Sequence, residues 1–137
     1  MNTKEFFEQA YRINDLIDSK AEMIVRLRCR AENITSSLSP VRVQSSGSDR
    51  PMADMLDMMT DLEAEITEDS RKLCETLKSI IRVIQQISDP RYRLILEKHY
   101  ILGLPFRRIG SEMGYSLSHV MKLHDEALLA AKIPEDA

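Results

Sequence analysis

The stretch FRRIGSEMGYSLSHVMKLHDEAL, Phe106 to Leu128, holds two short helical patterns with a glycine between them. Gly114 stands at the turn, where a residue without a side chain reaches positive φ at little cost. Gly110 lies one helical turn earlier and lets a second helix approach closely. The apolar residues that would lock the two helices together are Ile109, Met113, Val120 and Leu123. This spacing predicts a helix-turn-helix unit, and a plain corner of a helical bundle is the alternative.

The residues around this stretch mark the ends of its helices. Asp89 followed by Pro90 is typical of a helix start, and Gly103 is typical of a helix end. Pro105 opens the next short helix, and Ser116 caps the final one. The positions of the final helix that face inward are Leu117, Val120, Leu123, Ala127 and Leu128. The sequence thus predicts one helix that precedes the pair.

A seven-residue apolar pattern runs through the first segment, residues 2–38. Steps of four and three alternate along it, and nine of its ten positions are apolar. These positions are Phe6, Ala10, Ile13, Ile17, Lys20, Ile24, Leu27, Ala31, Ile34 and Leu38. Such a repeat is typical of a coiled-coil seam, so we expect one helix about 50 Å long.

A serine-rich stretch, SLSPVRVQSSGSDRP, follows as a linker, and Pro51 opens a second long helix. The second helix repeats the seam, with nine of eleven positions apolar. These positions are Met52, Met55, Met59, Leu62, Ile66, Asp69, Leu73, Thr76, Ile80, Val83 and Ile87. A linker of this length lets the second helix fold back antiparallel on the first.

The two charged exceptions support this hairpin. If Leu38 lies opposite Met52, Lys20 faces Asp69, and a buried hydrogen-bonded pair can fix the register. Residues 20–38 carry four bases and two acids, whereas residues 52–69 carry seven acids and no base. Further apolar residues beside the seams need another surface, either the C-terminal segment or a second copy of the chain. These residues are Leu16, Met23, Leu56, Leu77, Ile81 and Ile84.

The sequence therefore predicts an all-α fold with three parts. Residues 1–88 form a long antiparallel coiled-coil helical hairpin with its linker at 39–50, and this part favours oligomerisation. Residues 89–132 form the helix-turn-helix domain, and residues 133–137 form an acidic tail.

Composition excludes several classes of protein. The net charge of -3 gives no general attraction to nucleic acid, so any such attraction must be local. No apolar run has the length of a signal peptide or a membrane span, so we expect a cytoplasmic protein without membrane contact. Cys29 and Cys74 are expected to be reduced packing residues. The sequence has no pattern for catalysis or for a cofactor, so we do not expect an enzyme. We also expect no metal site, because His119 and His124 are poorly spaced to bind one metal ion.

The last third of the chain, DPRYRLILEKHYILGLPFRRIGSEMGYSLSHVMKLHDEALLAAK, resembles region 4 of sigma-70-type factors. Together with the coiled N-terminal part and the QSSGSDRPMADM linker, it resembles small phage and prophage proteins of Gram-positive bacteria, similar to ArpU- and RinA-type late transcription regulators. The resemblance implies sequence-specific binding to double-stranded DNA near phage promoters and activation of late genes for packaging or lysis.

The resemblance makes the final helix, from Ser116 to about Ala130, the recognition helix in the major groove. Its outward residues would contact DNA; they are Leu117, Ser118, His119, Met121 and Lys122, with His124 further along. Leu117 is either partly packed or in contact with a thymine methyl group. Arg107 and Arg108 would clamp the phosphate backbone, since residues 90–124 hold six bases and two acids. Because one such module binds weakly, a dimer is favoured.

Two other functions fit the same pattern. A small terminase subunit for DNA packaging also combines a helix-turn-helix unit with coiled helices, and a ring of more than four chains would favour it. A protein-interaction module is the other, with the hairpin holding RNA polymerase or a phage protein. Leu117 favours this second alternative, because sigma region 4 commonly has arginine or glutamate at this part of the helix.

Overall fold

The computed structural model describes the backbone of residues 1–37 and 49–135 and the side chains of residues 1–34 and 50–135. Every regular element in those ranges is helical, as the sequence predicted. The elements in chain order are α1 (Thr3–Ser37), α2 (Asp49–Gln85), α3 (Pro90–Leu96), the π-helical turn η1 (Glu97–Ile101), α4 (Phe106–Met113) and α5 (Leu117–Ala130). Leu38 and most of the linker predicted at 39–50 lie outside the described residues.

Local capping explains where several of these helices begin. Asn2 and Glu5 form a reciprocal capping box, in which the Glu5 N–H donates to Asn2 Oδ1 at 2.8 Å and the Asn2 N–H donates to Glu5 Oε2 at 3.1 Å. The Asp89 carboxylate accepts a hydrogen bond from the Arg91 N–H at 2.9 Å, and Pro90 is the first residue of α3. The start predicted for α3 is therefore confirmed.

The chain divides into two compact units. The first, which we call the hairpin unit, comprises Asn14–Arg71. The second, which we call the composite unit, combines Met1–Ile13 with Lys72–Ala137. This division differs from the boundary expected at residues 88 and 89, because the first turns of α1 and the last turns of α2 share a core with the C-terminal helices.

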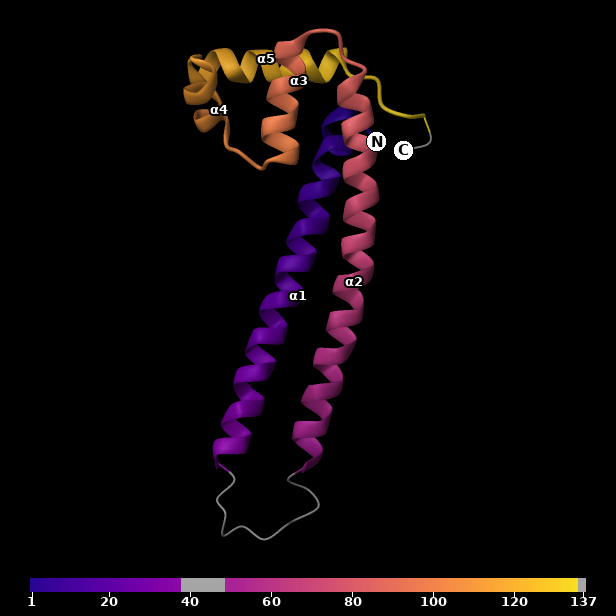
Figure 1. Cartoon of the computed structure of the whole chain (residues 1–137), viewed down its shortest axis with the longest axis vertical. Coiled ribbons are helices and arrows are strands. Elements are labelled where there is room, and N and C mark those ends of the chain that lie inside the picture. Colours follow the sequence, from indigo (N-terminus) through magenta and orange to yellow (C-terminus); the bar gives the residue numbers. More distant parts are fainter. Residues whose placement is uncertain (38–48, 136–137) are drawn as a thin grey trace. The chain divides into compact units, whose positions relative to one another are not determined.

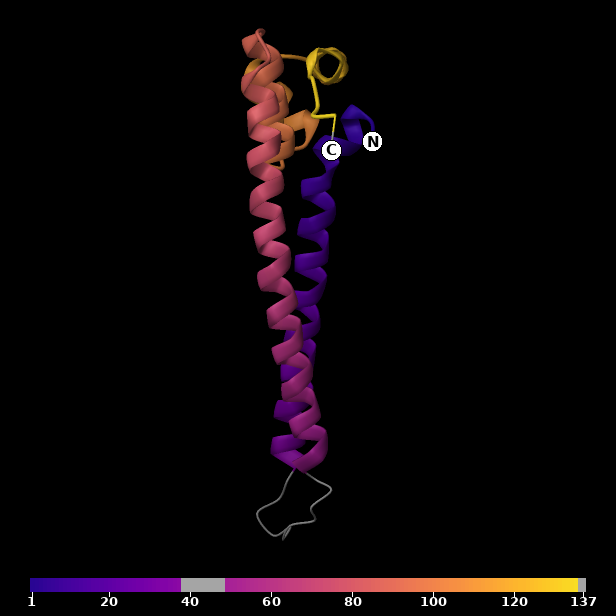
Figure 2. The same ribbon diagram turned by 90° about the vertical axis from the view of Figure 1, so that its right-hand side faces the viewer.

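In the hairpin unit, α1 and α2 run side by side in opposite directions (Figures 1 and 2). Ile24 and Leu27 of α1 are buried against Met59 of α2. Partly buried neighbours complete this small cluster; they are Met55, Leu62 and Ile66. All six residues are seam positions in the predicted repeat, so the antiparallel pairing of the two seams is confirmed here.

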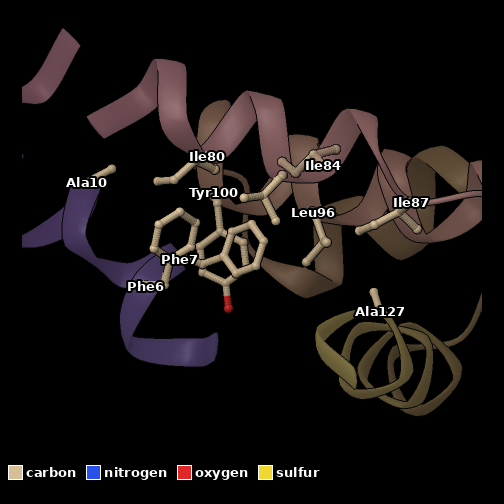
Figure 3. Close-up of a cluster of buried hydrophobic side chains, with 10 residues drawn as sticks. Phe6, Phe7, Ala10, Ile80, Ile84, Ile87, Leu96, Tyr100 and Ala127 are labelled. Atoms are coloured by element: carbon tan, nitrogen blue, oxygen red, sulfur yellow. The ribbon is translucent and has the colours of Figure 1, made fainter. Parts of the chain in front are cut away.

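The core of the composite unit gathers side chains from helices distant in sequence (Figure 3). Its buried members are Phe6, Phe7, Ala10, Ile80, Val83, Ile84, Ile87, Leu96, Tyr100 and Ala127. The rings of Phe7 and Tyr100 lie together with centroids 5.1 Å apart. Leu77 packs against the same core, so Leu77 and Ile84 are covered within the chain. Leu16, Met23, Leu56 and Ile81 stay exposed.

The two cysteines lie at the protein surface. Cys29 and Cys74 are free thiols, but both are exposed, so the prediction that they are packing residues is wrong. Each lies between two seam positions of its helix, where the apolar repeat gives no information. Among the helices of residues 1–37 and 49–135, none combines the length and apolar character needed to cross a membrane.

Candidate nucleic-acid interface

The turn between α4 and α5 depends on Gly114. This residue ends α4 in the left-handed conformation, with φ of 74° and ψ of 29°. The next N–H, that of Tyr115, donates to the carbonyl oxygen of Gly110 at 2.8 Å. A residue with a Cβ would be strained at this φ, whereas glycine is not. The predicted role of Gly114 is thus confirmed at the level of the backbone.

At Gly110, α4 passes close to the backbone of Tyr115 in the turn and to Val120 of α5. A Cβ placed on Gly110 would lie 2.7 Å from the backbone oxygen of Tyr115 and 3.3 Å from Cγ2 of Val120. The first distance is shorter than a Cβ contact can be, and backbone cannot move aside as a flexible side chain can. The close approach expected at Gly110 is therefore confirmed.

A separate apolar cluster holds α4 and α5 in place. Ile109 of α4 is fully buried with Val120 and Leu123 of α5, and Ile95 of α3 completes the buried set. Met113, predicted to face inward, is partly buried beside them. Tyr92 of α3 adds a polar tie, because its hydroxyl donates to Glu126 of α5 at 2.9 Å. The inner face of α5 is thereby occupied by protein.

The opposite face of the first turns of α5 is open. Ser116 caps the helix by accepting a hydrogen bond from the His119 N–H at 3.2 Å. The capping Ser116 is exposed, and so are five of the residues predicted on this face: Leu117, Ser118, His119, Met121 and Lys122. Leu117 is 39% exposed and Met121 is 48% exposed. The expectation that Leu117 faces inward is therefore wrong, because Val120 and Leu123 are the residues that α5 buries in these turns. These six residues form one surface, which we call the α5 face.

His119 is oriented by a residue that the sequence did not single out. Its imidazole meets the ring of Tyr115 edge to face, with centroids 4.7 Å apart. Tyr115 is itself partly buried in the cluster that holds α4 and α5. The contact connects the α5 face to the core of the unit. Aromatic residues four apart across a turn are the signal that could have identified it.

The basic residues near the α5 face are partly neutralised. Glu112 accepts from Lys98 at 2.6 Å and from Arg108 at 3.1 Å. The hydrogen bond from Lys98, followed by that from Arg108, lowers the pKa of the Glu112 carboxyl. Arg91 is paired with Asp89 at 3.0 Å. Of the six bases counted between residues 90 and 124, three are thus in ion pairs.

Of the other three bases, Arg93 is partly buried, whereas Arg107 and Lys122 are exposed. In the part of the chain that the structure describes, neither side chain has a hydrogen-bonded or ion-pair partner. The predicted phosphate clamp of Arg107 and Arg108 consequently consists of one free guanidinium and one that is tied to its own helix. The Arg108–Glu112 pair has the spacing of four residues that sequence alone can recognise.

His124 was expected further along the outward side of α5, and this expectation is wrong. The side chain is buried, with 5% exposed, and its Nε2 lies 2.7 Å from the Tyr100 hydroxyl. Burial lowers the pKa of His124, although a hydrogen bond to Asp125 acts in the opposite direction. His99 lies close by, with its ring stacked on that of Phe106 at 4.0 Å. These aromatic residues pack against the buried side of α5 at His124.

Comparison with known proteins adds no relative. No protein-family model, no curated protein and no solved structure matches the chain. Among the described residues, no three His, Cys, Asp or Glu side chains are grouped in a way that could hold a metal ion.

Proposed function

We propose that the protein is a sequence-specific DNA-binding regulator of transcription. In this proposal α4 and α5 act as a helix-turn-helix unit, similar to sigma-70 region 4, and α5 enters the major groove of double-stranded DNA. The protein would work as a dimer in the bacterial cytoplasm, as a phage or prophage activator of late genes that cooperates with host RNA polymerase.

One observation carries the proposal. The α5 face exposes six adjoining residues at the start of a helix whose other side is locked in a core by the close contact at Gly110. A recognition helix needs this combination, because its first turns must be both rigid and free of protein contacts to reach base edges. Ser118 and His119 offer hydrogen-bonding groups, and Leu117 offers a methyl contact to thymine. Arg107 and Lys122 offer two free positive charges for phosphate.

The number of free charges sets an expectation for affinity. Each phosphate neutralised contributes roughly 0.9 to the slope of binding against salt on logarithmic axes. With Arg107 and Lys122 as the free bases, one unit should therefore bind weakly and with a shallow slope. Two units in a dimer would double the slope and strengthen binding through linkage.

The deciding experiment selects fragments of the parent phage or prophage genome with the purified chain and sequences them. Enrichment of a short repeated motif, with two half-sites for a dimer, is the expected result. Recovery of fragments without any shared motif would contradict sequence-specific binding. The mass of the complex separates the regulator from a packaging protein, since a small terminase would form a ring of more than four chains.

A protein-interaction module is the second candidate, and the exposure of Leu117 and Met121 favours it. These residues are four apart, so they form one apolar spot on α5. Such a spot suits a groove in a partner such as RNA polymerase. Retention of purified RNA polymerase by the chain, lost in the Leu117→Ser, Met121→Ser double variant and without any selection of DNA, would support this alternative.

A further inference from the structure

The hairpin unit leaves apolar side chains outside its small core. Leu16 and Met23 lie seven residues apart on α1 and so share one side of the helix, and they are 54% and 43% exposed. Met58 of α2 is 52% exposed. Among the described residues, the buried cluster of this unit consists of Ile24, Leu27 and Met59, and Ala31 is buried outside that cluster. Two helices that bury so little gain little stability from their own pairing, because most helical stability comes from packing an apolar face.

A groove lies between the two helices at this exposed side. Met23 and Leu27 of α1 and Met58 and Leu62 of α2 line it, and its volume is about 400 Å³. The lining is thus mainly apolar along its length. Exposed apolar surface of this kind on a soluble protein marks a contact site for another molecule.

The rim of the groove carries opposite charges on its two sides. Arg26 and Arg30 stand on α1, and Asp61 and Glu65 stand on α2. Arg26 reaches Glu22 of its own helix at 3.9 Å, with both side chains at least 70% exposed, which is a weak pair. Arg30 and Asp61 have no ion-pair partner among the described residues. The charges around the groove are therefore largely unused within one chain.

This pattern complements itself under two-fold rotation. If a second copy lies on the groove with α1 of each chain against α2 of the other, bases meet acids on both sides of the axis. The same rotation places the methionine side chains of the two copies together, where flexible thioethers fill an irregular interface well. The alternative arrangement, α1 against α1, would set bases against bases.

We propose that the groove of the hairpin unit is the docking surface for a second copy of this chain, in an antiparallel four-helix dimer. The inference deepens the dimer that the proposed function requires, since it names the surface and the chemistry that hold it. Its test contains no DNA, so a failure here and a failure of DNA binding are distinguishable.

The first test measures mass by sedimentation equilibrium over a concentration series. We expect the wild type to form two-chain particles. The double variant Met23→Glu, Met58→Glu should weaken this association about 100-fold or more, since it places charges in the centre of the interface. Leu129→Glu is the matched control, because Leu129 is 88% exposed and belongs to the composite unit. Monomeric wild type, particles larger than two chains, or unchanged association of the double variant would overturn the proposal.

The second test exchanges charges and does not depend on the apolar variants. Arg26→Glu with Arg30→Glu makes one chain all acidic at the rim, and Asp61→Lys with Glu65→Lys makes another all basic. Each chain alone should associate at least about 10-fold more weakly than the wild type, because like charges meet across the axis. An equal mixture should recover the two-chain particle as a heterodimer. A role of these charges within one chain cannot be rescued by mixing, so the absence of recovery would overturn the proposal.

Discussion

Lys20 Nζ lies 2.6 Å from Asp69 Oδ2, and these two residues are the charged interruptions of the two apolar seams. The side chains are only 20% and 13% exposed, so the pair is largely shielded from water. The hydrogen bond from Lys20 to Asp69 raises the pKa of Lys20. The pairing was predicted from the sequence register, and its presence confirms that register within the hairpin unit.

Removing one partner of this pair should be worse than removing both. We expect Asp69→Leu to lower the melting temperature clearly, because it leaves Lys20 without its counter-charge among apolar neighbours. The double variant Lys20→Met, Asp69→Leu should recover most of that loss. Glu22→Ala, which breaks the exposed pair of Glu22 with Arg26, serves as the control and should change little. Thermal denaturation measures the melting temperatures. An equal loss in the single and the double variant would mean that the pair does not set the register.

Gly110→Ala should destabilise the composite unit by about 1–3 kcal/mol, as overpacking does. The added methyl group would stand 2.7 Å from the Tyr115 oxygen, so α4 and α5 must separate. Gly114→Ala should destabilise the unit by about 1–2 kcal/mol for a different reason, because alanine is strained at the positive φ of this position. Crowding is not the cause, since a Cβ on Gly114 would meet none of the surrounding atoms within 4 Å. Ser111→Ala, at an exposed position of the same helix, should stay within about 0.5 kcal/mol of the wild type. Urea denaturation measures all three, and a neutral Gly110→Ala would contradict the close approach.

The buried His124 should make stability depend on pH. Burial lowers its pKa in the folded state, whereas the unfolded chain takes up a proton near pH 6.5. Unfolding therefore binds a proton below that pH, and the free energy of unfolding should fall as the pH is lowered from about 7.5 towards 5.

Denaturation in urea across this range tests the dependence on His124. The fall should be smaller in His124→Gln, whose amide still offers an acceptor to the Tyr100 hydroxyl and does not titrate. His119→Gln, an equivalent change at an exposed position, should keep the dependence of the wild type. The same fall in all three proteins would remove His124 as its cause.

Arg107 and Arg108 should contribute unequally to DNA binding under the proposed function. Arg107→Ala should weaken binding to every sequence and reduce the salt slope by about 1 for each DNA-binding unit. Arg108→Ala should have the smaller effect, because Glu112 already holds its guanidinium at 3.1 Å. Lys78→Ala, an exposed base on α2, is the control. Fluorescence anisotropy titrations at several salt concentrations give the slopes, and equal slopes for all variants would exclude a phosphate contact at Arg107.

His119→Ala should change the choice of sequence more than the overall affinity. The imidazole stands on the α5 face and is braced by Tyr115, which suits a directed contact to a base edge. Loss of such a contact costs about 1–3 kcal/mol for the preferred base and relaxes selection at that position. Tyr115→Leu, which removes the brace and keeps an apolar side chain, should relax selection in part. Selection from a random DNA pool measures both, and unchanged preferences would exclude His119 from sequence readout.

Sequence by itself determined the features that depend on local spacing. The seven-residue repeat predicted which side chains of α1 and α2 face each other, because the helical period repeats along a whole helix. The capping residues Asp89 and Ser116 marked helix starts, since a side-chain oxygen must satisfy the free N–H groups there. Gly114 marked the turn because few other residues accept its backbone conformation.

Only the tertiary structure decided which residues from distant parts of the chain cover one another. A seam repeat does not say what packs on it, so Phe6 and Ile80 could not be assigned to one core with Tyr100. The outward placement of His124 failed for the same reason, because a partner 24 residues away buries it. Lys98 is neutralised by Glu112 across 14 residues, so counting bases along the chain overstated the free positive charge. Burial and charge pairing depend on distances in space, and the order of residues along a helix does not specify them.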